Sequence, residues 1–338
     1  MNIYDFTEEK LRQYFISKGE NPAKAKIMIN NLYKKRITDF NDISEFGNKI
    51  KMMLKSDFSI EPLNLVSKTS CPDTHKFLFE LCDGHTIESV LMKHDYGNGI
   101  CISSQVGCNM NCAFCESGKL KKVRNLTPGE MIQQILEVEK ITNESISNIA
   151  IMGIGEPFDN YENIIGFTEI AANQSGLGFG YNKITISTCG IVPKIIEYSK
   201  RETVCNLAIS LHAPNNSIRN EIMPINKKYP IEQLIDAVQQ YTESNNKKAT
   251  FAYIMLKGVN DSDECAYKLC NLIKDIRCYV NLIPYNKTSS SCFDKSDKDR
   301  ISSFYDILKK HNINVIVRRE FGSELQAACG QLKASKKD

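Results

Sequence analysis

Three cysteines lie close together in the chain, at Cys108, Cys112 and Cys115, with the spacing C-x3-C-x2-C. Three thiolates this close can surround one metal centre. A closed zinc site needs a fourth ligand, and a closed four-iron cubane needs a fourth cysteine, yet no neighbouring residue is an obvious candidate for either. On a cubane, three thiolates leave one iron open to a substrate. A zinc knuckle or a chance cluster of cysteines is the alternative.

Strand and helix patterns alternate from about residue 99 to the C-terminal end, and these elements must position the cysteines. The predicted strands are residues 99–104, 148–152, 183–188, 204–210, 249–255, 279–284 and 313–318. The predicted helices lie near 128–141, 160–173, 192–200, 230–243, 262–274 and 297–311. The first of these helices begins with a capping box, Thr127-Pro128-Gly129-Glu130. Such alternation predicts an α/β fold with a parallel sheet, which fits an incomplete barrel; an open doubly wound sheet is the alternative.

The cysteines directly follow the first predicted barrel strand, and barrels of this kind carry their chemistry at the C-terminal ends of the strands. The cysteine spacing resembles that of the radical S-adenosylmethionine (SAM) enzymes, in which SAM occupies the open iron. Other polar or flexible residues follow later strands: Gly155, Glu156, Ser187, Ser210, His212 and Asn286. Each is weak alone, because Gly155 can simply turn the chain and His212 can be a core histidine. Their shared edge favours a bound SAM.

The composition of the 338 residues, with 42% apolar and 25% charged, is typical of a soluble globular enzyme. No apolar run is long enough to cross a bilayer, and the first five residues do not resemble a signal peptide. The formal net charge of +3 is too small to identify a partner. The thirteen cysteines form no regular even framework. We therefore expect a reducing cytosol, where clustered cysteines hold metal or do chemistry.

The first 75 residues are predicted to form a helical accessory domain, followed by a β-hairpin extension at 76–97 and the barrel at 98–338. Asp83-Gly84 is a good turn signal for the hairpin. The segment 24–36 has five basic residues and no acidic one. It is either a phosphate-contacting surface or a solvated helix face, and the same alternatives apply to the basic segment 119–124, which follows the cysteines.

Six motifs together resemble the RlmN/Cfr family of radical SAM methyltransferases, which act on an adenosine of 23S ribosomal RNA (rRNA). The RlmN branch also modifies an adenosine beside the anticodon of some transfer RNAs (tRNAs). The resemblance runs from about residue 20 to 333. It implies a partial (β/α)6 radical SAM barrel with a small N-terminal helical domain, a 4Fe-4S cluster on the three cysteines, and a cytoplasmic location. The motifs are Gly107 to Cys115, Arg124 to Thr127, Met152 to Pro157, Ser210 to Pro214, Asn281 to Pro284 and Ala327 to Leu332.

The resemblance also implies roles for single residues. Cys329 matches the methyl-carrying cysteine, Cys101 the resolving cysteine, and Glu88 the carboxylate that accepts the ring proton, although Cys101 is an alternative acceptor. A transient Cys101–Cys329 disulfide is compatible with the cytosol because it is catalytic. The matched SAM contacts are Gly155, Glu156, Ser187, Ser210, Leu211, His212 and Asn286. The implied partners are 23S rRNA, tRNA and an electron donor such as flavodoxin or ferredoxin, with a monomeric chain and no membrane.

Val106 and Pro157 resemble the RlmN branch, which methylates C2 of adenine. The Cfr branch more often has cysteine and alanine there, methylates C8 and confers antibiotic resistance. Two hypotheses from other classes remain. One is a non-catalytic iron-sulfur or zinc protein that binds RNA. The other is a radical SAM enzyme that only generates a radical on a partner protein, which has no use for Cys101 and Cys329 as a pair.

Overall fold

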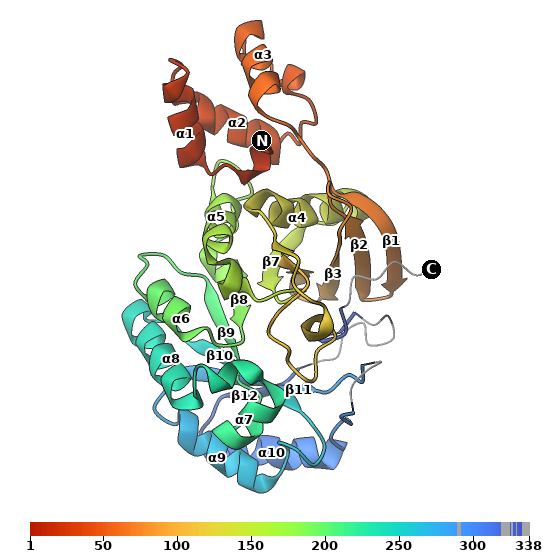
Figure 1. Cartoon of the computed structure of the whole chain (residues 1–338), viewed down its shortest axis with the longest axis vertical. Helices are drawn as coiled ribbons and strands as arrows, with labels where there is room; N and C mark the ends of the chain where they lie inside the picture. The colour runs from red at the N-terminus through yellow and green to blue at the C-terminus, as the bar shows by residue number, and fades with distance from the viewer. Residues whose placement is uncertain (289–291, 319–324, 326, 329, 333–338) are drawn as a thin grey trace.

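The structure is a computed structural model that describes residues 1–288, 292–318, 325, 327, 328 and 330–332. N-terminal helices, a set of antiparallel strands, and a long alternation of parallel strands and helices follow one another along the chain (Figure 1). The N-terminal helices lie at one end of the molecule, next to α4 (Pro128–Thr142) and α5 (Tyr161–Ala172). Helices α9 (Asp263–Ile273) and α10 (Lys298–Lys310) lie at the opposite end.

The parallel strands follow one another in space in the same order as in the sequence. They are β4 (Gly97–Ile102), β7 (Ile146–Ile151), β8 (Ile184–Thr188), β9 (Asn206–Ser210), β10 (Ala249–Met255), β11 (Cys278–Pro284) and β12 (Val315–Val317). A doubly wound sheet reverses its strand order at a switch point, and this sheet does not. Since β1 and β12 stand at its two ends, the sheet is an incomplete barrel, as predicted.

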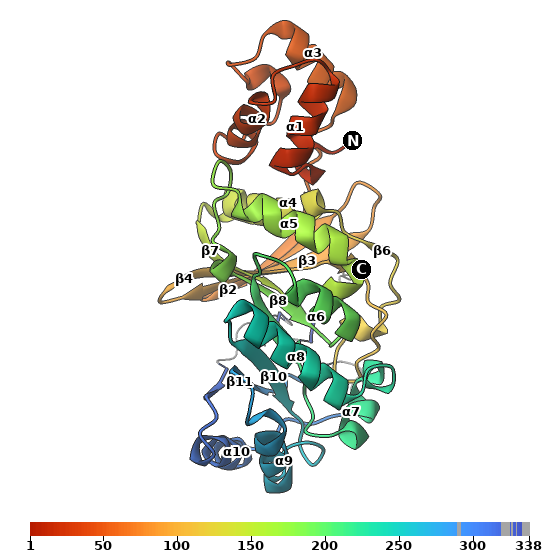
Figure 2. The same cartoon turned by 90° about the vertical axis from the view of Figure 1, so that its left-hand side faces the viewer.

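Helices connect successive parallel strands and cover the outside of the sheet (Figure 2). Besides those named above, they are α6 (Val192–Ser199), α7 (Asn216–Ile222) and α8 (Ile231–Asn245). Short α7 was not predicted. The capping box of α4 is confirmed: the Thr127 Oγ1 accepts from the Glu130 N–H at 3.2 Å, and the Glu130 carboxylate accepts from the Thr127 N–H at 2.9 Å.

Three antiparallel strands extend the sheet at β4: β1 (Asn64–Cys71), β2 (Thr74–Glu80) and β3 (Thr86–His94). The hairpin between β2 and β3 is confirmed, with Gly84 at φ 81° in the turn. The expectation that the first 75 residues are helical is wrong for its last part, because β1 is a strand. Almost all of β1 is exposed, so its sequence lacks the apolar alternation that marks a strand, and pairing with β2 decides its conformation.

The two faces of this extension differ because side chains alternate along a strand. On the outer face, Phe77, Phe79 and Ile87 pack in the main core. On the opposite face, which we call the inner face, lie Leu78 of β2, Glu88, Val90 and Met92 of β3, and Cys101 of β4. Val90 and Met92 pack there against Ala327 and Leu332 of the C-terminal segment, close to Cys101.

The N-terminal helices are α1 (Glu8–Ser17), α2 (Lys24–Tyr33) and α3 (Asn48–Asp57). Polar contacts join this region to the barrel: the Gly129 N–H donates to the Asp5 carboxylate at 2.9 Å, and the Asn173 amide donates to the Glu8 carboxylate at 2.7 Å. The division of the chain into three domains stays a prediction. Within the described residues, every helix is too short or too polar to span a bilayer.

Candidate active site

The three cysteines line one cavity of about 160 Å³ inside the barrel. The main chain turns sharply around them. Gly107 has φ 76°, and a Cβ there would lie 2.3 Å from the Lys121 carbonyl oxygen. The Cys108 N–H donates to the Leu120 carbonyl at 2.8 Å. Two short strands, β5 (Gln105–Val106) and β6 (Arg124–Asn125), pair across the ends of the segment. We call residues 107–118 the cluster loop.

The electrostatics of the cluster loop favour neutral thiols in the absence of a cation. Burial raises the pKa of Cys108 to about 12. It also raises the pKa of Cys112 well above its usual range, and the neighbouring Cys115 and Cys108 thiols add to the effect. A thiolate is the metal-binding form, so three thiolates gathered in this cavity require a strongly cationic partner.

An iron-sulfur cluster fits this donor set. The ligands are soft sulfur atoms, which select iron-sulfur clusters among other metals. Within the part of the chain that the structure describes, no three His, Cys, Asp or Glu side chains converge on one point to hold a single ion. A cubane does not need such convergence, because each cysteine binds a different iron. The three cysteines are therefore suited to the three protein-bound corners of a cubane.

Most of the residues predicted to contact SAM line the same cavity: Gly155, Glu156, Ser187, Ser210 and His212. Gly155 has φ 112°, and a Cβ there would lie 2.7 Å from the Gln105 side chain. The buried Glu156 carboxylate accepts from the Cys189 N–H at 2.7 Å and the Phe158 N–H at 2.9 Å. Burial raises the pKa of Glu156, while these amides act in the opposite direction.

His212 is buried and neutral. Its Nδ1 accepts from the Ile254 N–H at 3.0 Å, so the remaining proton is on Nε2. Burial lowers the pKa of His212 to about 3. Its ring meets the Phe114 ring edge-to-face at a centroid distance of 4.8 Å. The side chain of the preceding residue, Leu211, is fully buried in the main core and does not line this cavity, so its contact with SAM stays a prediction.

Arg219 of α7 is a residue that sequence reasoning missed. Its side chain is fully buried and donates to the carbonyls of Cys189, Ser210 and Leu211 and to the Asn226 amide oxygen. It therefore ties together the chain segments that follow β8 and β9. Burial lowers its pKa to about 10. A single arginine on a short helix resembles a surface charge, so the sequence offered no signal.

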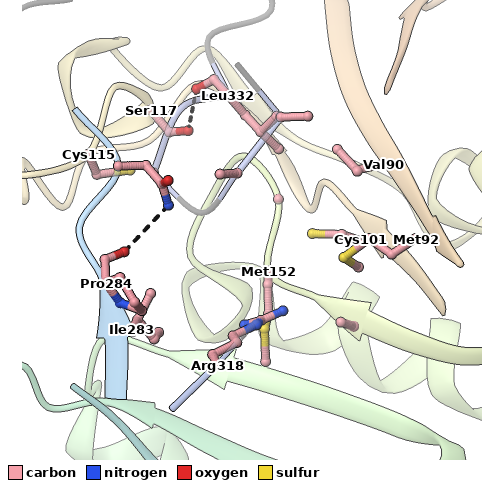
Figure 3. A pocket seen from close by; sticks show the side chains of 16 residues that line it. Val90, Met92, Cys101, Cys115, Ser117, Met152, Ile283, Pro284, Arg318 and Leu332 are labelled. Carbon is pink, nitrogen blue, oxygen red and sulfur yellow. Dashed lines mark hydrogen bonds between the residues drawn. The ribbon is translucent and has the colours of Figure 1, made fainter. Parts of the chain in front are cut away.

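A second cavity, of about 60 Å³, adjoins the first. Both cavities are lined by Cys115 and Ser117 of the cluster loop, and also by Met152, Ile283, Arg318 and Gly330. Figure 3 shows Val90, Met92 and Cys101 of the inner face on one side of the second cavity, and Cys115 and Ser117 on another. Asn286, the remaining predicted SAM contact, lines this second cavity and not the first.

The C-terminal segment is hydrogen-bonded to the cluster loop. The Glu116 N–H donates to the Gly330 carbonyl at 2.8 Å, and the Ser117 hydroxyl donates to the Leu332 carbonyl at 2.8 Å (Figure 3). Ala328 and Gly330 both line the second cavity. Cys329 itself lies outside the described residues. All twelve cysteines that the structure describes are free thiols.

Cys101 and Glu88 both lie on the inner face. Cys101 of β4 is directly opposite Val90 of β3, and Glu88 precedes Val90 by two residues. Glu88 is only 3% exposed and does not line either cavity. The Lys76 Nζ lies 3.2 Å from its Oε1, a contact that the sequence did not indicate.

The two basic segments proposed for RNA contact are largely engaged within the protein. Lys122 pairs with Asp159 at 2.6 Å, and Arg124 pairs with Asp83 and Glu130 at 2.6 and 2.7 Å. The N-terminal segment 24–36 likewise uses three of its cations in internal ion pairs. An RNA-binding surface on either segment stays a prediction.

Comparison with known families gives two matches along the chain. Residues 102–270 match the radical SAM superfamily. Residues 1–60 match the N-terminal domain of ribosomal RNA large subunit methyltransferases. The first match spans the cluster loop and most of the parallel strands, so the fold and the cysteine site together define a radical SAM enzyme.

Similar proteins agree over nearly the whole length. A protein of Spiroplasma citri named "Probable dual-specificity RNA methyltransferase RlmN" is 46% identical, over 98% of this chain and 97% of its own. A protein of the same name from Geobacillus kaustophilus is 45% identical, over 99% and 93%. The crystal structure of a radical SAM methyltransferase from Sphaerobacter thermophilus superposes with a TM-score of 0.93 at 35% identity, covering 99% of this chain and all of that one. This chain belongs to the RlmN family of radical SAM RNA methyltransferases, as its motifs predicted.

Proposed function

We propose that this chain methylates C2 of an adenosine in 23S rRNA, and of an adenosine beside the anticodon in tRNA, through an S-methylcysteine at Cys329. The observation that carries this proposal is the pair of adjoining cavities. Ala328 and Gly330, the neighbours of Cys329, line a cavity with Cys101, and that cavity continues past Cys115 into the one lined by the three cysteines. The full-length relatives named as dual-specificity RNA methyltransferases support the RNA substrates.

Cys108, Cys112 and Cys115 would hold a 4Fe-4S cluster, and the cavity residues Gly155, Glu156, Ser187, Ser210 and His212 would surround SAM. When bound, the cluster and SAM supply a methyl group and a 5′-deoxyadenosyl radical. The neutral His212 presents an Nε2–H donor to this cavity rather than a charge. The apolar packing of Phe114 and the burial of Glu156 exclude water from the reacting groups.

The remaining chemistry belongs to groups around the second cavity. The Cys329 thiolate would take the methyl group of SAM by displacement, because a thiolate is the strongest nucleophile among side chains. A sulfur–carbon bond forms on Cys329 as the methyl–sulfonium bond breaks, and S-adenosylhomocysteine leaves. The S-methyl group would give up one hydrogen atom to the 5′-deoxyadenosyl radical, and its carbon would bond to the adenine ring. Glu88 would then take the ring proton, and the unpaired electron of the adduct would return to the cluster. The Cys101 thiolate would attack the Cys329 sulfur and break the sulfur–methylene bond. The electron pair of that bond stays with the methylene carbon, which takes a proton to become the methyl group of the RNA, and the two cysteines end as a disulfide. An external dithiol must reduce that disulfide before the next cycle.

The proposal includes an electron donor of the flavodoxin or ferredoxin type, because the cluster must be reduced by one electron for each radical. We further propose a monomeric enzyme in the cytoplasm, where the RNA substrates and the reducing environment are found together.

Two mass-spectrometric measurements test this function. In the anaerobically purified protein, the peptide that contains Cys329 is expected to carry one methyl group, and Cys329→Ala to carry none. Nucleosides from RNA incubated with enzyme and SAM are expected to contain 2-methyladenosine. Finding 8-methyladenosine as the sole product would replace the C2 assignment with a Cfr-like one. Unmethylated Cys329 together with unmodified RNA would rule out the enzyme.

A further inference from the structure

A buried ion pair lies on the inner face, between β2 and β3. The Lys76 and Glu88 side chains are 16% and 4% exposed, with 3.2 Å between Nζ and Oε1. The strand register places Lys76 opposite Val90 and Leu78 opposite Glu88, so the lysine occupies the diagonal position next to the carboxylate. Because Val90 is opposite Cys101, a cation, a carboxylate and a thiol follow one another across three neighbouring strands.

Stability does not explain this ion pair. The surrounding side chains Leu78, Val90 and Met92 are apolar and buried. In such a place, the desolvation of two charges offsets most of their attraction, and apolar residues of similar volume stabilise a fold equally well. What the pair does provide is a carboxyl group held beside a cation and away from water. Burial alone favours the neutral form of a carboxyl group, and a neighbouring cation favours the charged form.

We propose that Lys76 is a positioning residue that holds the Glu88 carboxylate in place to accept the proton from the methylated adenine. This inference rests on the proposed function. In this step the ring C–H bond breaks, its electron pair stays with the ring, and the proton forms an O–H bond on Glu88. Lys76 takes no part in this proton transfer and partners first the carboxylate and then the neutral acid.

The described strands place Lys76 within ion-pair distance of the Glu88 carboxylate, among neighbours of other kinds. Glu80 occupies the other diagonal position on β2 and adds a negative charge rather than a compensating one. Cys101 on β4 contributes a thiol. Among the described residues of the C-terminal segment, Ala327 and Leu332 pack against this face, and neither side chain titrates. The Ser103 hydroxyl donates to the Glu88 carbonyl at 2.7 Å, which holds the main chain of Glu88.

The test compares Lys76→Met, which removes the charge, with Lys76→Arg, which keeps it. Lys68→Met is the matched control, because Lys68 lies on β1 with its Nζ over the Phe77 ring, on the outer face. Three quantities are measured: methyl on the Cys329 peptide, the covalent RNA–protein adduct on a denaturing gel in single turnover, and the pH dependence of adduct decay. Cys329 methylation does not use Glu88, so it also reports whether each variant is folded.

Lys76→Met is expected to carry methyl on Cys329 like the unmodified chain and to accumulate the RNA adduct. Its adduct decay at neutral pH is expected to be about tenfold slower or more, with a pH dependence that differs from that of the unmodified chain. Lys76→Arg and Lys68→Met are expected to stay close to the unmodified chain. If Lys76→Met does not fold, Lys76→Gln keeps a hydrogen bond to Glu88 without the charge and is judged by the same criteria.

Adduct decay in the uncharged variant with an unaltered rate and pH profile would overturn the role of Lys76, and so would an equal defect in Lys76→Arg. The unmodified chain serves as the separate check on the enzyme itself. If it forms neither methylated Cys329 nor an adduct, the proposed function fails, whatever the lysine variants do.

Discussion

The two adjoining cavities are built in different ways. The larger one is lined by the cluster loop and by the inward side chains of parallel strands, and its three cysteines lie within one short stretch of sequence. The smaller one joins the inner face of the antiparallel extension, the cluster loop and the C-terminal segment. The residues that line it come from positions more than two hundred residues apart in the chain, such as Val90 and Leu332. The first is held by buried strands, and the second by a few hydrogen bonds and a small apolar cluster.

This difference in construction indicates that the two cavities have different tasks. A reactive radical source requires a rigid, water-excluding cavity, and the interior of a parallel barrel provides one. The smaller cavity instead brings together Cys101 and the neighbours of Cys329, the groups that the proposed thiol chemistry needs. We therefore expect substitutions around the larger cavity to affect stability and cluster binding, and those around the smaller one to affect reactivity with little loss of stability.

Cys112→Ser gives the largest expected effect in this comparison. Loss of one of three cluster ligands should reduce the iron and sulfide content of the anaerobically reconstituted protein to background and abolish RNA methylation. The exposed Cys82→Ser is the control and should bind iron normally. Full iron content in Cys112→Ser, measured by a colorimetric iron assay, would contradict the assignment of the cluster loop.

Arg219→Met should destabilise the fold by about 3 kcal/mol or more, because it leaves several buried carbonyl groups without donors. Urea unfolding followed by circular dichroism measures this change. Arg201→Met is the control: it removes an exposed ion pair to Glu169 and should change the free energy of unfolding by less than about 1 kcal/mol. Equal effects of the two variants would show that Arg219 does not hold the larger cavity together.

His212 should make stability depend on pH. Since burial lowers its pKa from 6.5 to about 3, the unfolded chain binds a proton below pH 6.5 that the folded chain does not. Stability is therefore complete above about pH 6.5 and falls by up to about 1.4 kcal/mol per pH unit as the pH decreases toward 3. His212→Asn suits the φ of 57° and keeps an acceptor. Urea unfolding of the two proteins at pH 5 and 6.5 should show a weaker pH dependence in the variant.

Ser117→Ala gives the smallest expected effect and tests the smaller cavity. It removes the 2.8 Å hydrogen bond to the Leu332 carbonyl at a cost of about 1 kcal/mol. In a Cys112→Ser background, in which the cluster is lost and Cys329 stays an unmethylated thiol, labelling of Cys329 by a maleimide, quantified by mass spectrometry, should become about fivefold faster, while the urea midpoint changes little. An unchanged labelling rate would mean that this hydrogen bond does not restrain the C-terminal segment.

Much of the fold and part of the site could be predicted from local sequence. The expected parallel strands and helices agree with the structure to within a few residues, because their apolar runs and caps are strong local signals. The cluster loop was predicted for the same reason, since its ligands are neighbours in the chain. Strand β1 and helix α7 were missed, because an exposed strand and a two-turn helix have weak patterns. The role of Cys329 remains a prediction.

The sequence by itself determined the cysteine spacing, the order of strands and helices, and, through its motifs, the family. Tertiary structure alone decided that Lys76 meets Glu88, that Arg219 is buried among carbonyl groups, and that Ser117 holds the C-terminal segment. These contacts depend on strand register and on loops folding back over long distances in the chain. No local pattern encodes them, because the side chains become neighbours only when the core packs.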